Sequence, residues 1–291
     1  MAKQGNIGVT SENIFPIIKK FLYSDHEIFL RELVSNAVDA TQKLNTLASI
    51  GEFKGELGDL TIHVELGKDT ITISDRGIGL TAEEIEKYIN QIAFSGANDF
   101  LEKYKDDANA IIGHFGLGFY SAFMVADEVT VNTKKYGSDK AYQWKSSGAD
   151  GYTIEETAKE NCGTEIIMRI REDAEGEDYS QYLESYKIQS LVKKYSDYIR
   201  FPIKMDVETS VNTAKEGEEP KYEQVTEEKV LNSMVPIWRK NKNEVTQEEY
   251  NNYYKEKFMD MTDPLVTINV SAEGTVSYKA LMFIPAVAPY G

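Results

Sequence analysis

The chain has 291 residues, a formal net charge of −16, three histidines and one cysteine, Cys162. This length suits two domains of ordinary size, while one cysteine excludes an internal disulfide framework and the scattered histidines predict no zinc site. A chain this acidic repels nucleic-acid phosphate, so we expect no nucleic-acid partner. Its apolar runs are far shorter than a membrane span, and its first residues lack a signal-peptide pattern, so we expect a cytoplasmic protein without a membrane partner.

The first long predicted element is a helix over residues 27–44. Apolar residues recur there at spacings of three and four, as on one buried helix face: Phe29, Leu33, Ala37, Ala40 and Leu44. A polar stripe, spaced 4, 3 and 4, runs along the same helix: Glu32, Asn36, Asp39 and Lys43. Such a stripe suits a hydrated metal–phosphate group, because carboxylates orient water, amide oxygens ligate Mg²⁺ and ammonium groups face phosphate. The alternative is the solvated face of an amphipathic helix.

Period-two alternation of apolar and polar residues predicts strands at residues 60–66, 70–74, 129–131 and 166–170. Alternation of this kind is typical of a half-buried, mostly antiparallel sheet with one face covered by helices. The predicted fold class is therefore α+β, a two-layer sandwich.

The sequence Ser-Asp-Arg-Gly-Ile-Gly-Leu, residues 74–80, follows the second of these strands. An aspartate at a strand end before two glycines predicts a turn with close backbone approach. A buried Asp75 carboxylate there could accept a hydrogen bond from an exocyclic amine such as that of adenine. The alternative is an ordinary strand-to-helix turn, since Thr81 and Glu84 form the pattern of a capping box.

Two glycine-containing segments come later in the chain. Residues 112–121 place Gly113, Gly116 and Gly118 before a predicted helical run at 119–125, and main-chain amides at a helix start bind anions. The segment matches neither a Walker A loop nor a dinucleotide fingerprint, and a flexible glycine hinge, which a nucleotide lid also needs, is the alternative. Gly163 and Thr164 precede another strand, where the threonine is either a turn residue or a hydroxyl beneath a base.

The chain divides into three predicted regions. Dense helix and strand signals cover residues 1–208, a polar segment at 209–224 reads as a linker or hairpin loop, and a new segment starts at 225 and runs to 291. The alternative for 209–224 is a long surface loop within one domain. Because the sequence ends just after a strand-like stretch at 278–284, we expect the last segment to be the start of a longer domain.

These four motifs, in this order, resemble the ATPase superfamily shared by the heat-shock-protein-90 chaperones, DNA gyrase B, the MutL proteins and sensor histidine kinases. The text of residues 32–40, ELVSNAVDA, favours the first three, and residues 115–121, FGLGFYS, resemble the chaperones. Similarity to the chaperones continues at 191–203, 236–238, 246–250 and 280–285, which covers nearly the whole chain. The short polar segment at 209–224 is similar to the bacterial type.

The resemblance implies an N-terminal ATP-binding domain, the start of a middle domain, and a role for each motif. Glu32 is the expected general base, with Arg31 beside it, and Asn36 the expected Mg²⁺ ligand. Asp75, Gly79 and Thr164 contact adenine, partly through water, and Leu80 lines an apolar wall beside them. Asp39 and Lys43 border the nucleotide, and four amides hold the phosphates when a lid closes: those of Gly116, Leu117, Gly118 and Phe119.

Some residues depart from the family pattern. Phe94 stands where a lysine is usual, Arg76 replaces a smaller residue, and Leu80 replaces a methionine. With phenylalanine at position 94, the polar contacts that the family makes from this stretch to the ribose or α-phosphate are in question. Leucine at position 80 preserves an apolar wall.

For the whole protein, the resemblance implies a homodimeric, ATP-hydrolysing chaperone that remodels client proteins, with co-chaperones as further partners and ATP, ADP and Mg²⁺ as ligands. A middle-domain arginine and a C-terminal dimerisation region complete the family's machinery, so we expect this chain to bind nucleotide but hydrolyse it slowly. Two rivals remain: a DNA-acting ATPase, which needs a basic surface, and a non-catalytic, nucleotide-gated binding module.

Overall fold

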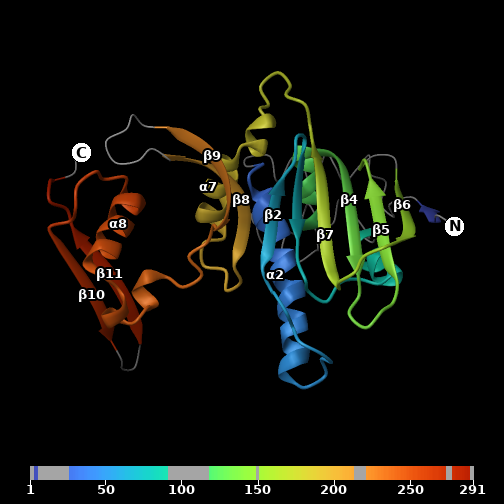
Figure 1. Cartoon of the computed structure of the whole chain (residues 1–291), viewed down its shortest axis with the longest axis horizontal. Helices are drawn as coiled ribbons and strands as arrows, with labels where there is room; N and C mark the ends of the chain where they lie inside the picture. The colour runs from blue at the N-terminus through green and yellow to red at the C-terminus, as the bar shows by residue number, and fades with distance from the viewer. Residues whose placement is uncertain are drawn as a thin grey trace, which may run out of the picture. The chain divides into compact units, whose positions relative to one another are not determined.

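The computed structural model describes residues 3–5, 26–90, 118–148, 151–212, 221–272 and 277–288. The chain forms two compact units, Met1–Asn232 and Ser233–Gly291. Figure 1 shows the helices and strands of both units. Within the described residues, no helix is both long enough and apolar enough to cross a membrane.

A nine-stranded sheet forms the base of the first unit, in the order β1-β6-β5-β4-β7-β3-β2-β8-β9. Every neighbouring pair is antiparallel except β2 and β8, which run parallel. The strands are β1 (Lys3–Gly5), β2 (Ile62–Leu66), β3 (Thr70–Ser74), β4 (Ala126–Lys134), β5 (Ala141–Ser146), β6 (Tyr152–Thr157), β7 (Gly163–Ile170), β8 (Ile203–Asn212) and β9 (Tyr222–Val230). The predicted mostly antiparallel sheet is confirmed.

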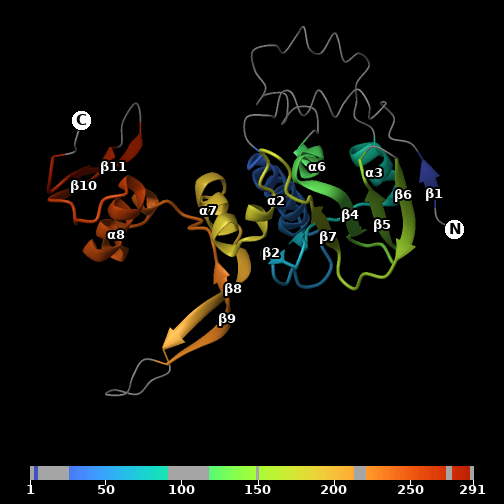
Figure 2. The same cartoon turned by 90° about the horizontal axis from the view of Figure 1, so that it is seen from above.

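Helices cover one face of this sheet, as Figure 2 shows for α2, α3 and α6. The described helical segments are α2 (Ile28–Ser49), α3 (Ala82–Ile85), η1 (Glu86–Asn90), η2 (Gly118–Ser121), α6 (Ala122–Val125), η3 (Ser180–Leu183) and α7 (Ser185–Tyr195). The predicted capping box at the start of α3 is present, with Thr81 and Glu84 exchanging hydrogen bonds. Helices on one face of a sheet give the two-layer α+β architecture that the sequence predicts.

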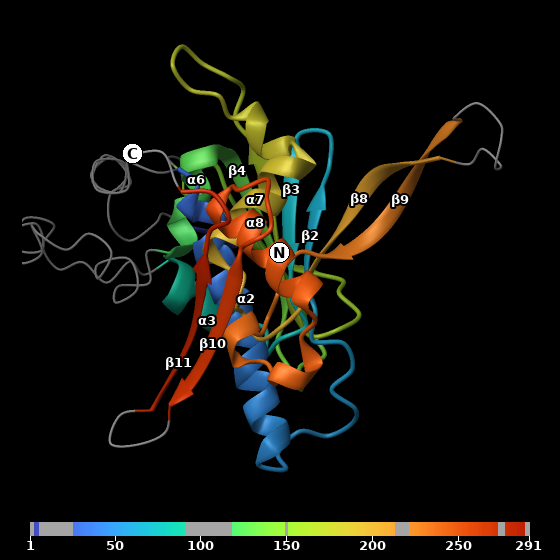
Figure 3. The same ribbon diagram turned by 90° about the vertical axis from the view of Figure 1, so that its left-hand side faces the viewer.

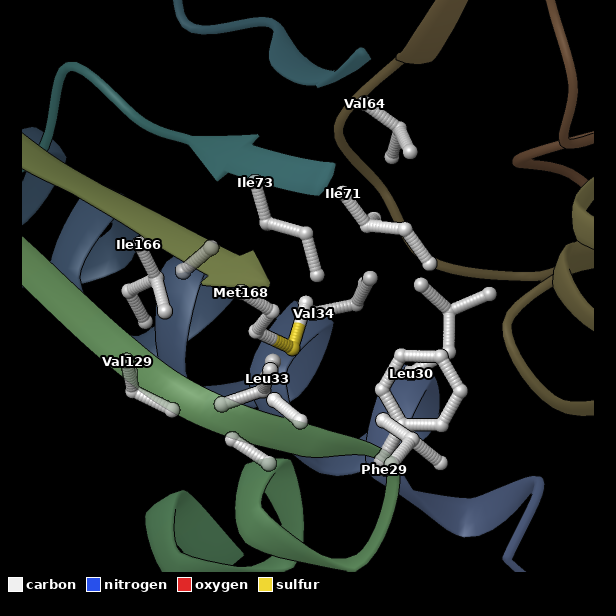
Figure 4. Packing of buried hydrophobic residues seen from close by; sticks show 14 of the residues in the cluster. Phe29, Leu30, Leu33, Val34, Val64, Ile71, Ile73, Val129, Ile166 and Met168 are labelled. Carbon is white, nitrogen blue, oxygen red and sulfur yellow. The ribbon is translucent and has the colours of Figure 1, made fainter. Parts of the chain in front are cut away.

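The core lies between α2 and the sheet. Figure 4 shows four residues of α2 facing six strand residues: Phe29, Leu30, Leu33 and Val34 against Val64, Ile71, Ile73, Val129, Ile166 and Met168. The helix residues recur at the spacing of one helical face, and the strand residues alternate along their strands. The register places Ile73 between Val64 and Ile166, so the buried residues of three strands line up on the side of α2.

Strands β8 and β9 form a long hairpin that leaves the rest of the sheet, as Figure 3 shows. The polar segment predicted at 209–224 falls within this hairpin, and its residues 213–220 lie outside the described part of the chain. Because β9 pairs with β8 from Tyr222 to Val230, the two compact units separate after Asn232, later than the boundary that composition suggests. The three functional regions 1–208, 209–224 and 225–291 stay a prediction.

The second unit pairs a helix with a two-stranded antiparallel sheet. Its elements are η4 (Ile237–Arg239), η5 (Lys242–Glu244), α8 (Gln247–Phe258), β10 (Val266–Ala272) and β11 (Tyr278–Ile284). Rings of α8 pack on the sheet, with the Tyr254 and Phe283 centroids 5.2 Å apart. Strand β11 coincides with the strand-like stretch predicted at 278–284.

Candidate nucleotide-binding site

Asp75 lies at the end of β3 and is only 7% exposed. Its Oδ1 accepts hydrogen bonds from the main-chain N–H groups of Gly77, at 2.7 Å, and Thr164, at 3.3 Å. Within the described part of the chain, Oδ2 makes no hydrogen bond. Burial raises the pKa of the Asp75 carboxyl to about 7, although both amides and Lys159 oppose that rise by favouring the charged form. The site therefore holds a buried carboxyl group with one oxygen available to a ligand.

The turn after Asp75 packs directly on α2. Ile78 donates its N–H to the carbonyl of Ala40 at 3.0 Å, and a Cβ added to Gly77 would lie 2.4 Å from the Ala40 carbonyl carbon. Gly79 has φ +65°, and a Cβ there would lie 1.9 Å from the carbonyl oxygen of Lys134. Neither glycine position has room for a side chain, so the close backbone approach predicted for this turn is present at both glycines.

Thr164 lies beside Asp75 at the start of β7. Their backbones are paired, Asp75 N–H to the Thr164 carbonyl at 2.9 Å and Thr164 N–H to the Asp75 carbonyl at 3.2 Å. The Thr164 hydroxyl lies 2.9 Å from the hydroxyl of Thr133 on β4, which also accepts from the Leu80 N–H at 2.9 Å. Thr133 therefore joins two of the predicted site residues, Leu80 and Thr164, and motif analysis missed it.

The predicted catalytic residues lie towards the N-terminal end of α2. Arg31 donates to Glu32 Oε1 from Nε at 2.9 Å and from one terminal nitrogen at 2.7 Å. The other carboxylate oxygen of Glu32 faces Gly118, where an added Cβ would lie 2.8 Å from Oε2. The structure thus brings together the predicted acid, its neighbouring arginine and the first described residue of the predicted phosphate motif.

The N-terminal end of α2 is fastened to α7. Glu27 accepts from Lys187 at 2.6 Å, Lys194 at 2.8 Å and the Tyr195 hydroxyl at 3.3 Å. The Arg31 guanidinium lies 6.0 Å from the centre of the Tyr195 ring, within the range of a cation–π contact. These contacts fix the helix turn that carries Glu32, and only a structure could reveal them, since α7 is far away in sequence.

The remaining residues of the polar stripe, Asn36, Asp39 and Lys43, are exposed on α2. Glycine contacts mark the two ends of this stretch, Gly118 at Glu32 and Gly77 at Ala40. Eight residues of helix separate them, about 12 Å at 1.5 Å per residue, which is comparable to an extended nucleoside triphosphate. The motifs predicted to bind base and phosphate are therefore separated along α2 by about the length of an extended nucleoside triphosphate.

Some predicted residues lie outside the described residues: Gly116, Leu117 and Phe94. Phe119 is described and lies buried in η2, where its ring packs edge-on to Trp144 at 5.4 Å. Arg76 is exposed and, with Lys159, borders a recess of about 300 Å³ beside Asp75 and Cys162. Among the described residues, no group of three or more His, Cys, Asp or Glu side chains could hold a metal ion.

Residues 23–176 match the family described as histidine kinase-, DNA gyrase B-, and HSP90-like ATPase, and residues 181–229 and 208–291 match the Hsp90 protein family. Chaperone protein HtpG of Bacteroides thetaiotaomicron is 57% identical over 286 residues, which are 98% of this chain and 40% of that protein. The HtpG proteins of Porphyromonas gingivalis and Halalkalibacterium halodurans are 48% and 49% identical, over 99% and 96% of this chain and 41% and 45% of their own lengths.

The chain thus spans less than half the length of these relatives. The two family matches cover the helix-on-sheet unit that carries Asp75 and Glu32 and continue through the second unit. The chain therefore belongs to the family of histidine kinase-, DNA gyrase B- and HSP90-like ATPases, on its HSP90 branch.

Proposed function

We propose that this chain binds ATP and ADP between α2 and the strand ends at Asp75 and Thr164, and that it hydrolyses ATP to ADP and phosphate. The observation that supports this most directly is the buried Asp75 carboxyl, whose Oδ1 is held by two amides while Oδ2 stays available. A fixed acceptor in a buried position suits an exocyclic amine such as that of adenine. Gly79 and Leu80 border the base.

The phosphates extend along α2 towards Glu32, past the exposed Asp39 and Lys43, and meet the amides that begin η2 at Gly118 and Phe119. The amides of Gly116 and Leu117, in the same motif, belong to this proposal as well. Lys43 supplies a cation along this path, where negative charge has to be balanced.

Asn36 is proposed as the protein ligand of Mg²⁺. Mg²⁺ usually takes only one or two protein oxygens, together with phosphate oxygens and water, so the absence of an acidic cluster among the described residues fits this ion. Asn36 is exposed and lies one turn of α2 after Glu32. When bound, the ion would neutralise charge on the phosphates; Asn36 would hold it, and Glu32 Oε2, which Arg31 does not engage, would hold the water.

In hydrolysis, a water oxygen forms a bond to the γ-phosphorus, the bond to the bridging oxygen breaks, and the water proton passes to the Glu32 carboxylate. A positioned base contributes about a hundredfold to ten-thousandfold, and placement of water and donors supplies most of the rest. The ion pair with Arg31 occupies Glu32 Oε1, so the proton passes to Oε2, which faces Gly118. We propose that turnover by this chain is slow.

The wider function follows from the relatives, which are named as chaperones. We propose that nucleotide binding closes a lid over the site and promotes docking between the N-terminal regions of two protomers, and that hydrolysis resets them. In this cycle the homodimer remodels client proteins in the cytoplasm, assisted by co-chaperones.

Calorimetric titration of the chain with Mg-ADP tests the binding site, with Asp75→Asn as the variant and Asp206→Asn, an exposed aspartate of β8, as the matched control. Binding by the wild type and the control, and its loss in Asp75→Asn, is the expected result. A wild-type chain that binds neither ADP nor ATP would refute the proposal.

The ion pair between Arg31 and Glu32 supports a second candidate, a nucleotide-gated binding module without catalysis, because one oxygen of the expected base is already engaged by arginine. Glu32→Ala separates the two functions. Loss of phosphate release with ADP affinity retained supports the ATPase, whereas unchanged turnover supports the module.

A further inference from the structure

Thr133 is a buried hydroxyl residue to which the proposed mechanism gives no role. It lies on β4, directly opposite Thr164 on β7, and is 0% exposed. Its Oγ1 has three polar neighbours: the Leu80 N–H at 2.9 Å, the Gly163 carbonyl oxygen at 3.2 Å and the Thr164 hydroxyl at 2.9 Å. The hydroxyl thus connects the two turns that flank Asp75.

The chemistry of these three neighbours fixes the direction of each hydrogen bond. A hydroxyl has one proton to donate and two lone pairs that accept. The Leu80 N–H can only donate, so it takes one lone pair, and the Gly163 carbonyl can only accept, so it takes the proton. The remaining lone pair of Thr133 must then accept the proton of Thr164. No other assignment makes all three contacts hydrogen bonds.

This direction determines what Thr164 offers to a ligand. With its proton held by Thr133, the partly exposed Thr164 hydroxyl presents only lone pairs. Asp75 beside it also presents an acceptor, because its Oδ1 is occupied by two amides and Oδ2 remains. When the Asp75 carboxyl is ionised, above about pH 7, these two neighbouring groups both present acceptors, and together they suit a ligand group that donates.

We propose that Thr133 is a positioning residue for base recognition, which holds the Thr164 hydroxyl as an acceptor and so selects a 6-amino purine over a 6-oxo purine. This inference rests on the proposed adenine-nucleotide site. A 6-amino group, or a water that it orders, donates to these acceptors. A 6-oxo group brings another acceptor against them, and neither of the two groups has a proton to offer it while Asp75 is ionised and Thr133 holds the proton of Thr164.

The test, at pH 8 where Asp75 is ionised, compares ADP with inosine 5′-diphosphate, which carries oxygen at position 6 of the base and, with it, a hydrogen on N1. Calorimetry in Mg²⁺ buffer gives the ratio of the two dissociation constants for the wild type, Thr133→Val and Thr133→Ser. Valine keeps the shape without the hydroxyl and frees the Thr164 proton, so we expect the preference for ADP to fall about tenfold, the effect of one hydrogen bond. Serine keeps the hydroxyl and should keep the ratio.

A double-mutant cycle separates this role from a general effect on structure. If Thr133 acts through Thr164, then Thr133→Val should change the ratio by less than about twofold once Thr164→Val is present. A ratio that is unchanged in Thr133→Val alone, or that falls equally on both backgrounds, would overturn the inference. Failure of the wild type to bind ADP would instead refute the proposed function itself.

If Thr133→Val does not fold, the wild-type chain still gives the answer. Nuclear magnetic resonance should then detect a Thr164 hydroxyl proton that exchanges slowly with water and lies close in space to Thr133. A Thr164 hydroxyl proton in fast exchange with solvent would show that Thr133 does not hold it, and the proposal would be wrong.

Discussion

Asp75→Asn is expected to stabilise the folded chain at neutral pH while abolishing nucleotide binding. Asparagine retains the Oδ1 acceptor for the Gly77 and Thr164 amides, so the turn keeps both hydrogen bonds. Its amide nitrogen, however, replaces Oδ2 with a donor, which opposes the donor group of adenine. Stability and binding should therefore change in opposite directions.

The size of the stabilisation follows from the pKa of Asp75, which burial raises from 3.8 to about 7. Below pH 3.8 both the folded and the unfolded chain hold the proton, so the aspartate costs nothing. Between pH 3.8 and 7 only the folded chain holds it, so stability falls as the pH rises through this range. Above pH 7 the cost is constant, about 4 kcal/mol for a difference of about three pH units.

Urea unfolding at pH 5 and pH 8 measures this dependence. A Trp238→Phe background leaves Trp144, which is 0% exposed in the first unit, as the fluorescent tryptophan. The stability advantage of Asp75→Asn should grow by about 3 kcal/mol between the two pH values, while the exposed-site control Asp206→Asn should show no such growth. An advantage that is independent of pH, or an Asp75→Asn chain less stable than wild type at pH 8, would refute the reasoning.

Three further substitutions test the rest of the site. Gly79→Ala should lower the free energy of unfolding, measured in urea, by about 3 kcal/mol or more, because its methyl would lie 1.9 Å from the Lys134 carbonyl oxygen. The control Gly137→Ala has a similar φ but nothing within 4 Å, so it should lower that free energy by only about 1–2 kcal/mol. Equal losses would contradict the proposed clash. Glu32→Gln should lower phosphate release about a hundredfold or more with ADP affinity nearly unchanged, and undiminished turnover would remove Glu32 from catalysis. Gly118→Ala should push the Glu32 carboxylate, 2.8 Å from the added methyl, and lower turnover about a hundredfold without lowering the melting temperature; normal turnover would show that the carboxylate position is unimportant.

Individual helices and strands could be predicted from the sequence where the hydrophobic pattern was strong. The helix predicted over 27–44 is present as α2, Ile28–Ser49, because apolar spacing of three and four over that length fits one buried face. The strand over 70–74 is present as β3 for the equivalent reason in period two. Helix ends carry weaker signals than helix faces, which explains why α2 continues beyond the predicted end.

The β8–β9 hairpin was not fully predictable, because the polar sequence at 209–224 favours a linker or a hairpin loop without deciding between them, and a long surface loop is the alternative. Strand β9 is exposed along almost its whole length, so it lacks the buried alternation that reveals a strand. Its pairing with β8 is a long-range property of the backbone, and only the three-dimensional register displays it.

Thr133 illustrates why part of the site escaped prediction although a signal was present. Val129 and Val131 mark the buried face of β4, and period two places residue 133 on that same face. A threonine at a buried strand position needs a hydrogen-bond partner, and this polar residue among buried apolar ones is the informative observation. Which partner it finds depends on the approach of Leu80 and Gly163, residues distant in sequence.

The proposed site gives the cost of Asp75 and the direction of the Thr133 hydrogen bonds one common explanation. Asparagine at position 75 would avoid the burial of a carboxyl group, and valine at 133 would pack on β4 without any polar requirement. Each of those residues, however, would introduce or release a donor at the pocket wall. The proposed recognition of a donating base requires the less stable choice at position 75 and the more demanding choice at position 133, whereas stability alone favours neither.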